Sequence, residues 1–123
     1  MTTPYSDEVP DSAGRILPRY LFETRVRICL ERDSQSLAVQ GWTRDLSEGG
    51  LNAFVAQALA VGEFVTLEIP LPGSGQPVIP AKVVRALGTE YGFQFTALNA
   101  KQRMQIRATL KGRAAIPRHD SGR

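Results

Sequence analysis

Six short runs of β-forming residues, each separated from the next by turn formers, constrain the fold of this chain most strongly. The first run, residues 23–31, alternates arginines with Val26, Ile28 and Leu30, which is the period of two expected of a half-buried strand. Further runs rich in Val, Ile, Phe and Thr occupy residues 37–47, 50–56, 63–71, 78–87 and 90–98. Six such runs, at a spacing of about 10 to 12 residues, predict an all-β barrel or sandwich built from antiparallel hairpins.

One later segment, residues 100–111, has the pattern of a helix. Asn99 can cap it, Gln102 stands at the third helical position as in a capping box, and Gly112 ends it. Its apolar face is narrow and consists mainly of Met104, Ile106 and Leu110. We therefore expect this helix to lie against the strands rather than to form a core of its own.

Length and composition indicate one soluble domain. A chain of 123 residues, with 42% hydrophobic and 22% charged residues, can bury a core without metals or disulfides. Cys29 is the single cysteine, so it cannot form an internal disulfide, and we expect it to be buried by packing. The sequence shows no basic, apolar signal peptide, and no run approaches the roughly 20 apolar residues of a membrane helix. We expect a cytoplasmic protein.

Charge is distributed unevenly along the chain. Residues 101–123 carry seven Lys and Arg against one Asp, a net charge of +6, so the first 100 residues sum to −3. A basic tail can bind nucleic acid, but no aromatic residues stand among these cations, and a solvated helix face with a frayed end is favoured. The predicted organisation is a flexible arm at 1–14, a folded domain at 15–112 and a flexible basic tail at 113–123.

The chain lacks the residues that most enzymes and metal sites need. Cys29 and His119 are the only cysteine and histidine and lie far apart, so we expect no metal site and no cofactor. A nucleophile would need a positioned base, whereas His119 falls in the predicted tail, where we expect it to be solvated. We therefore expect no enzyme. Trp42 could stack on a base, but a partly buried position in the fold is favoured.

Two short motifs could hold a ligand. In RILPR, Arg15 and Arg19 present guanidinium forks that suit phosphate oxygens or the O6 and N7 edge of guanine. In DLSEGG, Asp45 and Ser47 project to one face of a regular strand, where a carboxylate can accept guanine N1 and N2 hydrogens, and Gly50 allows close backbone approach. Each motif has an alternative: solvated arginines on an arm outside the strands, and a capped β-turn with Asp and Ser bonding local amides.

Taken together, RILPR, DLSEGG and VIPAKVVRALGTEYGFQF resemble the PilZ domain family of bacterial cyclic di-GMP receptors, over Arg15 to Leu110. The family pattern is R-x-x-x-R on an N-terminal arm, D/N-x-S-x-x-G on a barrel strand, and a closing hairpin of the type V-V-R…Y-G-F-x-F. The resemblance implies a six-stranded antiparallel β-barrel with a C-terminal helix, in agreement with the strand count. It also implies that cyclic di-GMP is bound by Arg15, Arg19, Asp45, Ser47 and Gly50.

The implied function is a cyclic di-GMP receptor that orders its arginine arm on ligand binding and signals to an unidentified protein partner. An alternative is a protein-interaction module of the same fold whose nucleotide site is idle. Nucleic-acid binding through residues 101–123 is a third, disfavoured reading. Gly14 stands directly before Arg15, where many members carry another arginine. The resemblance is therefore compatible with one bound cyclic di-GMP or with an intercalated pair.

Overall fold

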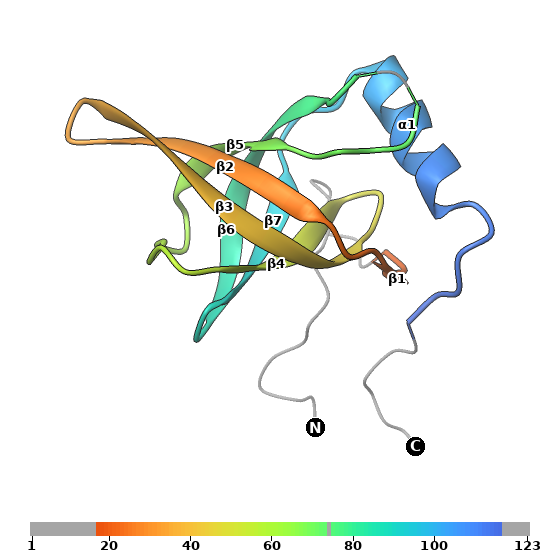
Figure 1. The fold of residues 1–123 in the computed structure, drawn as a ribbon, viewed down its shortest axis with the longest axis horizontal. Helices are drawn as coiled ribbons and strands as arrows, with labels where there is room; N and C mark the ends of the chain where they lie inside the picture. The colour runs from red at the N-terminus through yellow and green to blue at the C-terminus, as the bar shows by residue number, and fades with distance from the viewer. Residues whose placement is uncertain (1–16, 74, 117–123) are drawn as a thin grey trace.

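Antiparallel pairing closes six strands of this chain into a β-barrel (Figure 1). The computed structural model describes residues 17–73 and 75–116. Its elements are β1 (Tyr20–Leu21), β2 (Arg25–Arg32), β3 (Gln35–Leu46), β4 (Gly50–Val55), β5 (Phe64–Glu68), β6 (Val78–Leu87), β7 (Glu90–Phe95) and α1 (Ala100–Leu110). The order around the barrel is β3, β2, β5, β6, β7 and β4, which returns to β3. The predicted six-stranded antiparallel barrel with a C-terminal helix is confirmed.

The barrel closes because β3 is long enough to pair with several neighbours. Its residues 35–42 pair with β2, and its residues 41–46 pair with β4. Beyond the end of β2, the short strand β1 adds two pairs, with Tyr20 opposite Leu46 and Leu21 opposite Asp45. The sequence did not predict β1, because two residues are too few to show an alternation.

Alternation of side chains fills the barrel with apolar residues. In β2, Val26 and Ile28 point inward and are buried, while Arg25 and Arg27 are exposed. The largest fully buried side chains of the fold are Phe93, Ile28, Leu46, Leu51, Leu67, Ile69, Ile79, Ile106, Val26, Val55 and Val83. Cys29 lies on the outer face and is only partly buried, so its predicted buried position was wrong. It follows Ile28 directly, and neighbouring residues of a strand point to opposite faces.

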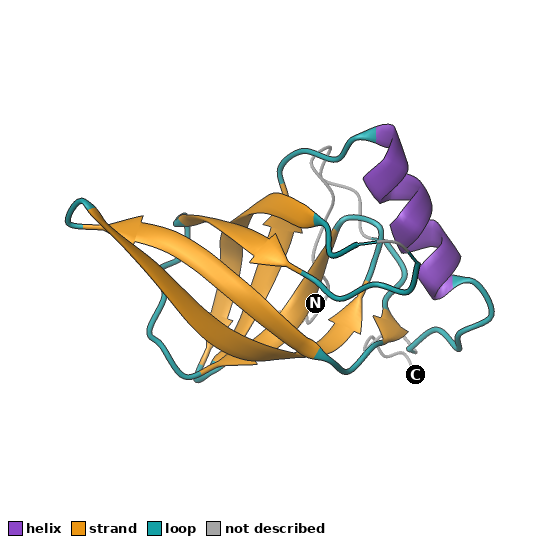
Figure 2. Cartoon of the chain, turned by 45° about the horizontal axis from the view of Figure 1, so that its top comes forward, coloured by secondary structure: helices purple, strands orange, loops and turns teal. Residues whose placement is uncertain are grey.

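Helix α1 begins with the predicted capping box. Asn99 Oδ1 accepts a hydrogen bond from the backbone N–H of Gln102 at 2.7 Å, and Gln102 Oε1 accepts one from the backbone N–H of Asn99 at 3.1 Å. Ile106 and Leu110 are buried in the core cluster, with the helix lying at one end of the barrel (Figure 2). Met104 is exposed, so its predicted place on the apolar face was wrong. Residues two apart in a helix do not share a face.

The segments that flank the barrel are tied to each other. Tyr20 and Ala115 form an isolated antiparallel bridge, and the backbone N–H of Ile116 donates to the carbonyl of Arg19 at 2.8 Å. The Arg113 guanidinium lies 5.3 Å from the centre of the Phe22 ring. Residues 113–116 of the predicted tail are thus held against β1. Residues 117–123, with His119, and the predicted arm at 1–14, lie outside the described residues, and the domain limits stay predictions.

A bidentate ion pair fixes the loop before β5 to the barrel. Arg32 Nη2 lies 2.8 Å from Glu63 Oε1, and Arg32 Nε donates to Glu63 Oε2 at 2.9 Å. The same guanidinium donates to the carbonyl of Ala58 at 2.7 Å, while Glu63 Oε1 accepts the backbone N–H of Ala60 at 3.1 Å. The pair therefore joins the end of β2 to the loop and also closes the turn within the loop.

We expect this ion pair to make stability depend on pH. The hydrogen bond from Arg32 holds the pKa of Glu63 below its ordinary value of 4.5, so the pair stabilises the fold above that pH and less as the pH falls through the lowered pKa. Glu63→Gln should therefore melt below wild type at neutral pH, with the difference shrinking as the pH falls below 4.5 and through the lowered pKa. Calorimetric melting across this range is the measurement, and Glu31→Gln, at an exposed position of β2, is the control. A difference that stays constant with pH would contradict the prediction.

Candidate ligand-binding site

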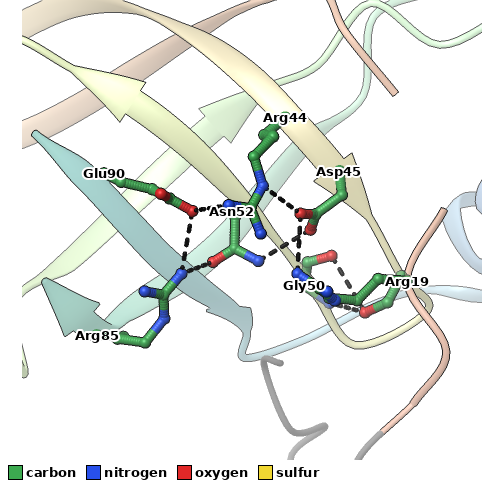
Figure 3. A network of polar contacts seen from close by, with 8 residues as sticks. Arg19, Arg44, Asp45, Gly50, Asn52, Arg85 and Glu90 are labelled. Atoms are coloured by element: carbon green, nitrogen blue, oxygen red, sulfur yellow. Dashed lines mark hydrogen bonds and ion pairs between the residues drawn. The ribbon is translucent and has the colours of Figure 1, made fainter. Parts of the chain in front are cut away.

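Asp45 is the centre of a network of polar side chains on the outer face of the barrel (Figure 3). Its Oδ2 accepts hydrogen bonds from Arg19 Nη1 at 3.2 Å and from Arg44 Nε at 3.0 Å. Its Oδ1 accepts one from Asn52 Nδ2 at 2.9 Å. Asp45 is 1% exposed and Arg19 is 5% exposed. A carboxylate with so little access to water is tolerated because three donors compensate it.

Glu90 is the second carboxylate of the network. Its side chain contacts Arg44 Nη1 at 2.8 Å and Arg85 Nη2 at 3.3 Å. Arg85 Nη2 also donates to Asn52 Oδ1 (Figure 3). Arg44 thus joins the two carboxylates directly, and Asn52 joins Asp45 to Glu90 through Arg85. Three guanidinium groups face two carboxylates in this network, and the excess positive charge suits an anionic ligand such as a phosphate.

The strand register brings these side chains into one row across four strands. Asp45 of β3 lies opposite Asn52 of β4, Asn52 lies opposite Gly92 of β7, and Gly92 lies opposite Arg85 of β6. Gly92 has no side chain at the middle of this row. Arg85 can therefore reach across it to Asn52, which the observed hydrogen bond confirms.

Two β-bulges turn the ends of the row toward the outer face. The register of β3 shifts between Thr43 and Asp45, and that of β6 shifts between Val83 and Arg85. In regular strands Asp45 would share the inner face with Thr43, and Arg85 would share it with Val83. One extra residue in each strand reverses that direction. The bulges are thus the local reason why both charged side chains meet outside the core.

Ser47 lies in the turn that follows β3, and Gly50 is the first residue of β4. The backbone N–H of Ser47 donates to the carbonyl of Gly50 at 2.8 Å. Ser47 Oγ accepts the backbone N–H groups of Gly49 at 3.1 Å and of Gly50 at 3.2 Å. These are the local bonds of the turn-capping alternative. They apply to Ser47 but not to Asp45, which accepts hydrogen bonds from the side chains of Arg19, Arg44 and Asn52. A ligand contact by Ser47 or Gly50 stays a prediction.

The two sequence motifs meet in the fold at the ion pair of Arg19 with Asp45. Arg15 lies outside the described residues. Arg19 was expected on an arm outside the barrel; it is instead buried, because β1 returns its backbone to the edge of β3. Within residues 17–73 and 75–116, no three His, Cys, Asp or Glu side chains gather as metal ligands.

Sequence reasoning missed four members of the network: Arg44, Asn52, Arg85 and Glu90. Two signals were available. Arg44 directly precedes the motif aspartate, and Arg85 belongs to the VVR stretch of the family pattern. Nothing in the sequence pointed to Asn52 or Glu90, because their positions in the network depend on cross-strand register.

Comparison with known proteins decides the family. The model of the PilZ domain family matches residues 15–112, which is most of the chain. The chain belongs to the PilZ domain family. The match spans both motifs of this PilZ domain and the whole barrel, and it ends just after α1.

Two solved structures illustrate what this PilZ domain is similar to. The PilZ domain of CeSA from a cellulose-synthesizing bacterium is 25% identical in sequence, with a TM-score of 0.58, over 75% of this chain and 94% of that chain. The PilZ domain with c-di-GMP of YcgR from Escherichia coli is 16% identical, with a TM-score of 0.48, over 69% of this chain and 84% of that chain. No curated protein matches this PilZ domain. Within its described residues, no helix has the length and apolar character needed to cross a membrane.

Proposed function

We propose that this PilZ domain is a receptor for cyclic di-GMP that passes the ligand signal to a protein partner in the cytoplasm. The observation that carries the proposal is the buried ion pair between Arg19 and Asp45, because it brings the two motifs of the family into one place. Arg44 and Arg85 add two further guanidinium groups beside this pair. A ligand with two phosphates and two guanines offers matching acceptors for such groups.

In the proposed mechanism, the ligand replaces hydrogen bonds and ion pairs that the side chains of the network form with one another in the free protein. Arg15 and Arg19 bind phosphate oxygens or the O6 and N7 edge of guanine. Asp45 accepts the N1 and N2 hydrogens of a guanine. Because Asp45 is almost inaccessible and already accepts three hydrogen bonds, Arg19 must move away from it before a base can reach it. Ligand binding therefore rearranges and orders the arginine arm, and the partner reads the altered surface.

The alternative is an interaction module whose nucleotide site is idle. PilZ domains are binding domains, and a module of this kind would bind its partner with no help from the ligand. The intact Arg19–Asp45 pair and the excess positive charge of the network favour the receptor.

Isothermal titration with cyclic di-GMP tests the proposal. We expect a dissociation constant of about 1 μM or somewhat tighter, because ordering the arm opposes binding. Arg15→Ala removes charge-assisted hydrogen bonds and should weaken binding about 10- to 150-fold. Lys101→Ala, on the exposed face of α1, is the matched control and should bind as wild type does. The same titration gives the stoichiometry, one ligand or two. Equal affinities of wild type and Arg15→Ala would overturn the proposed site.

A further inference from the structure

A pair of aromatic side chains is exposed on the barrel, beside the polar network. Trp42, predicted to be partly buried, lies on the outer face of β3 with 50% of its surface exposed. Phe54 of β4 lies directly opposite and is 43% exposed. Side chains opposite each other on antiparallel strands are about 5 Å apart at Cβ and lie side by side. Two adjacent rings on one face are thus open to solvent.

Arginines on the neighbouring strand flank this pair. Arg25 of β2 lies opposite Trp42, and Arg27 lies opposite Gln40, the next outward residue of β3. Both guanidinium groups are exposed, and neither forms an ion pair or side-chain hydrogen bond with another described residue. Arg25, Arg27 and Gln40 also line a cleft of about 300 Å³ together with Glu68 of β5. The two aromatic rings therefore lie beside two guanidinium groups and beside a cleft with further hydrogen-bonding side chains.

We propose that this surface, formed by Trp42, Phe54, Arg25 and Arg27, binds single-stranded nucleic acid. Barrel proteins that bind single strands combine exposed aromatic rings, on which successive bases stack, with cations that follow the phosphates. Trp42 and Phe54 supply two adjacent rings, and Arg25 and Arg27 supply the cations. The bases must be unstacked to reach a sheet face, which selects single strands over duplex. The sequence disfavoured nucleic-acid binding by the basic tail, whereas this surface is on the barrel.

The experiment uses the full chain and mixed-sequence RNA and DNA oligonucleotides of about 15 nucleotides, close to the longest site that one OB-fold barrel covers. Trp42 is the only tryptophan, so quenching of its fluorescence reports stacking directly. Binding to the variants is followed by anisotropy of a fluorescein-labelled strand. We expect quenching and a dissociation constant of about 1 to 100 μM, with RNA and DNA distinguished by their affinities.

Three sets of variants separate the contributions. Trp42→Ala and Phe54→Ala should each weaken binding about 5- to 150-fold, the loss expected from one stacked base. In wild type, raising the salt concentration from about 50 to about 200 mM should weaken binding about sevenfold. The double variant Arg25→Ala, Arg27→Ala should show a smaller dependence of affinity on salt. Phe64→Ala is the control, because Phe64 is 68% exposed on β5, outside this surface. It should bind as wild type does.

The proposal is overturned by any of four results. No binding up to about 100 μM oligonucleotide would exclude even a weak non-specific site. Equal losses of oligonucleotide affinity in Phe64→Ala and Trp42→Ala would show that the Trp42–Phe54 pair is not the binding surface. Quenching of Trp42 by cyclic di-GMP, with competition between the two ligands, would assign the rings to the cyclic dinucleotide site. Self-association that Trp42→Ala abolishes, without oligonucleotide binding, would identify an interface between copies of this chain.

Discussion

Replacing Asp45 with alanine should lower the free energy of unfolding by about 3 to 5 kcal/mol and abolish measurable binding of cyclic di-GMP. Asp45 accepts hydrogen bonds from Arg19, Arg44 and Asn52, and it is almost fully buried. Its removal takes the carboxylate partner from the buried guanidinium of Arg19. Removing one member of a buried ion pair costs much more than loss of an exposed one, because the remaining charge keeps its desolvation penalty. Urea denaturation and titration of the same preparation measure both effects.

The selectivity of Asp45 variants separates its binding role from its structural role. Asp45→Asn keeps the shape of the side chain and should be more stable than Asp45→Ala. If the carboxylate accepts guanine N1 and N2 hydrogens, the asparagine variant should lose preference for cyclic di-GMP over cyclic di-AMP, whose adenines lack that donor edge. A ratio between the two ligands that stays at the wild-type value would leave Asp45 with a purely structural role. A stability loss of only about 1 kcal/mol in Asp45→Ala would instead match a local cap.

Arg19→Ala should weaken cyclic di-GMP binding about 10- to 150-fold and should also destabilise the free protein by about 2 kcal/mol. An arm outside the barrel would give no stability change, but Arg19 is buried and ion-paired. The loss is smaller than for Asp45→Ala, because Asp45 keeps Arg44 and Asn52. Melting temperatures and titrations on the variant measure the two effects.

Arg19→Lys is the informative companion of this variant. Lysine keeps the positive charge but loses the planar fork, so it should recover much of the stability and little of the ligand affinity. Full recovery of both would mean that charge alone matters at this position. An unchanged melting temperature in Arg19→Ala would show that the ion pair contributes nothing to the fold.

The fold could be predicted from the sequence because its main signal is local. Alternation in β2 placed Val26 and Ile28 inside, and the capping box at Asn99 placed the start of α1. The site was harder, because its geometry depends on register between distant strands. An unbroken period of two would put Asp45 on the inner face, and the bulge that reverses it leaves no mark in the residue pattern. Arg85 depends on a second bulge in the same way.

The bridge between Tyr20 and Ala115 determines how this domain would respond to a mechanical load. The two bridged segments run antiparallel, so the chain leaving Arg19 and the chain leaving Ile116 emerge at the same end of the pair. A force applied between the two ends would therefore act first on the hydrogen bond from Ile116 to the Arg19 carbonyl, before it reached the strand pairs of the barrel. Arg19, which belongs to the proposed ligand site, would be the first residue under load. A ligand bound to Arg19 would therefore raise the force needed to separate the two bridged segments.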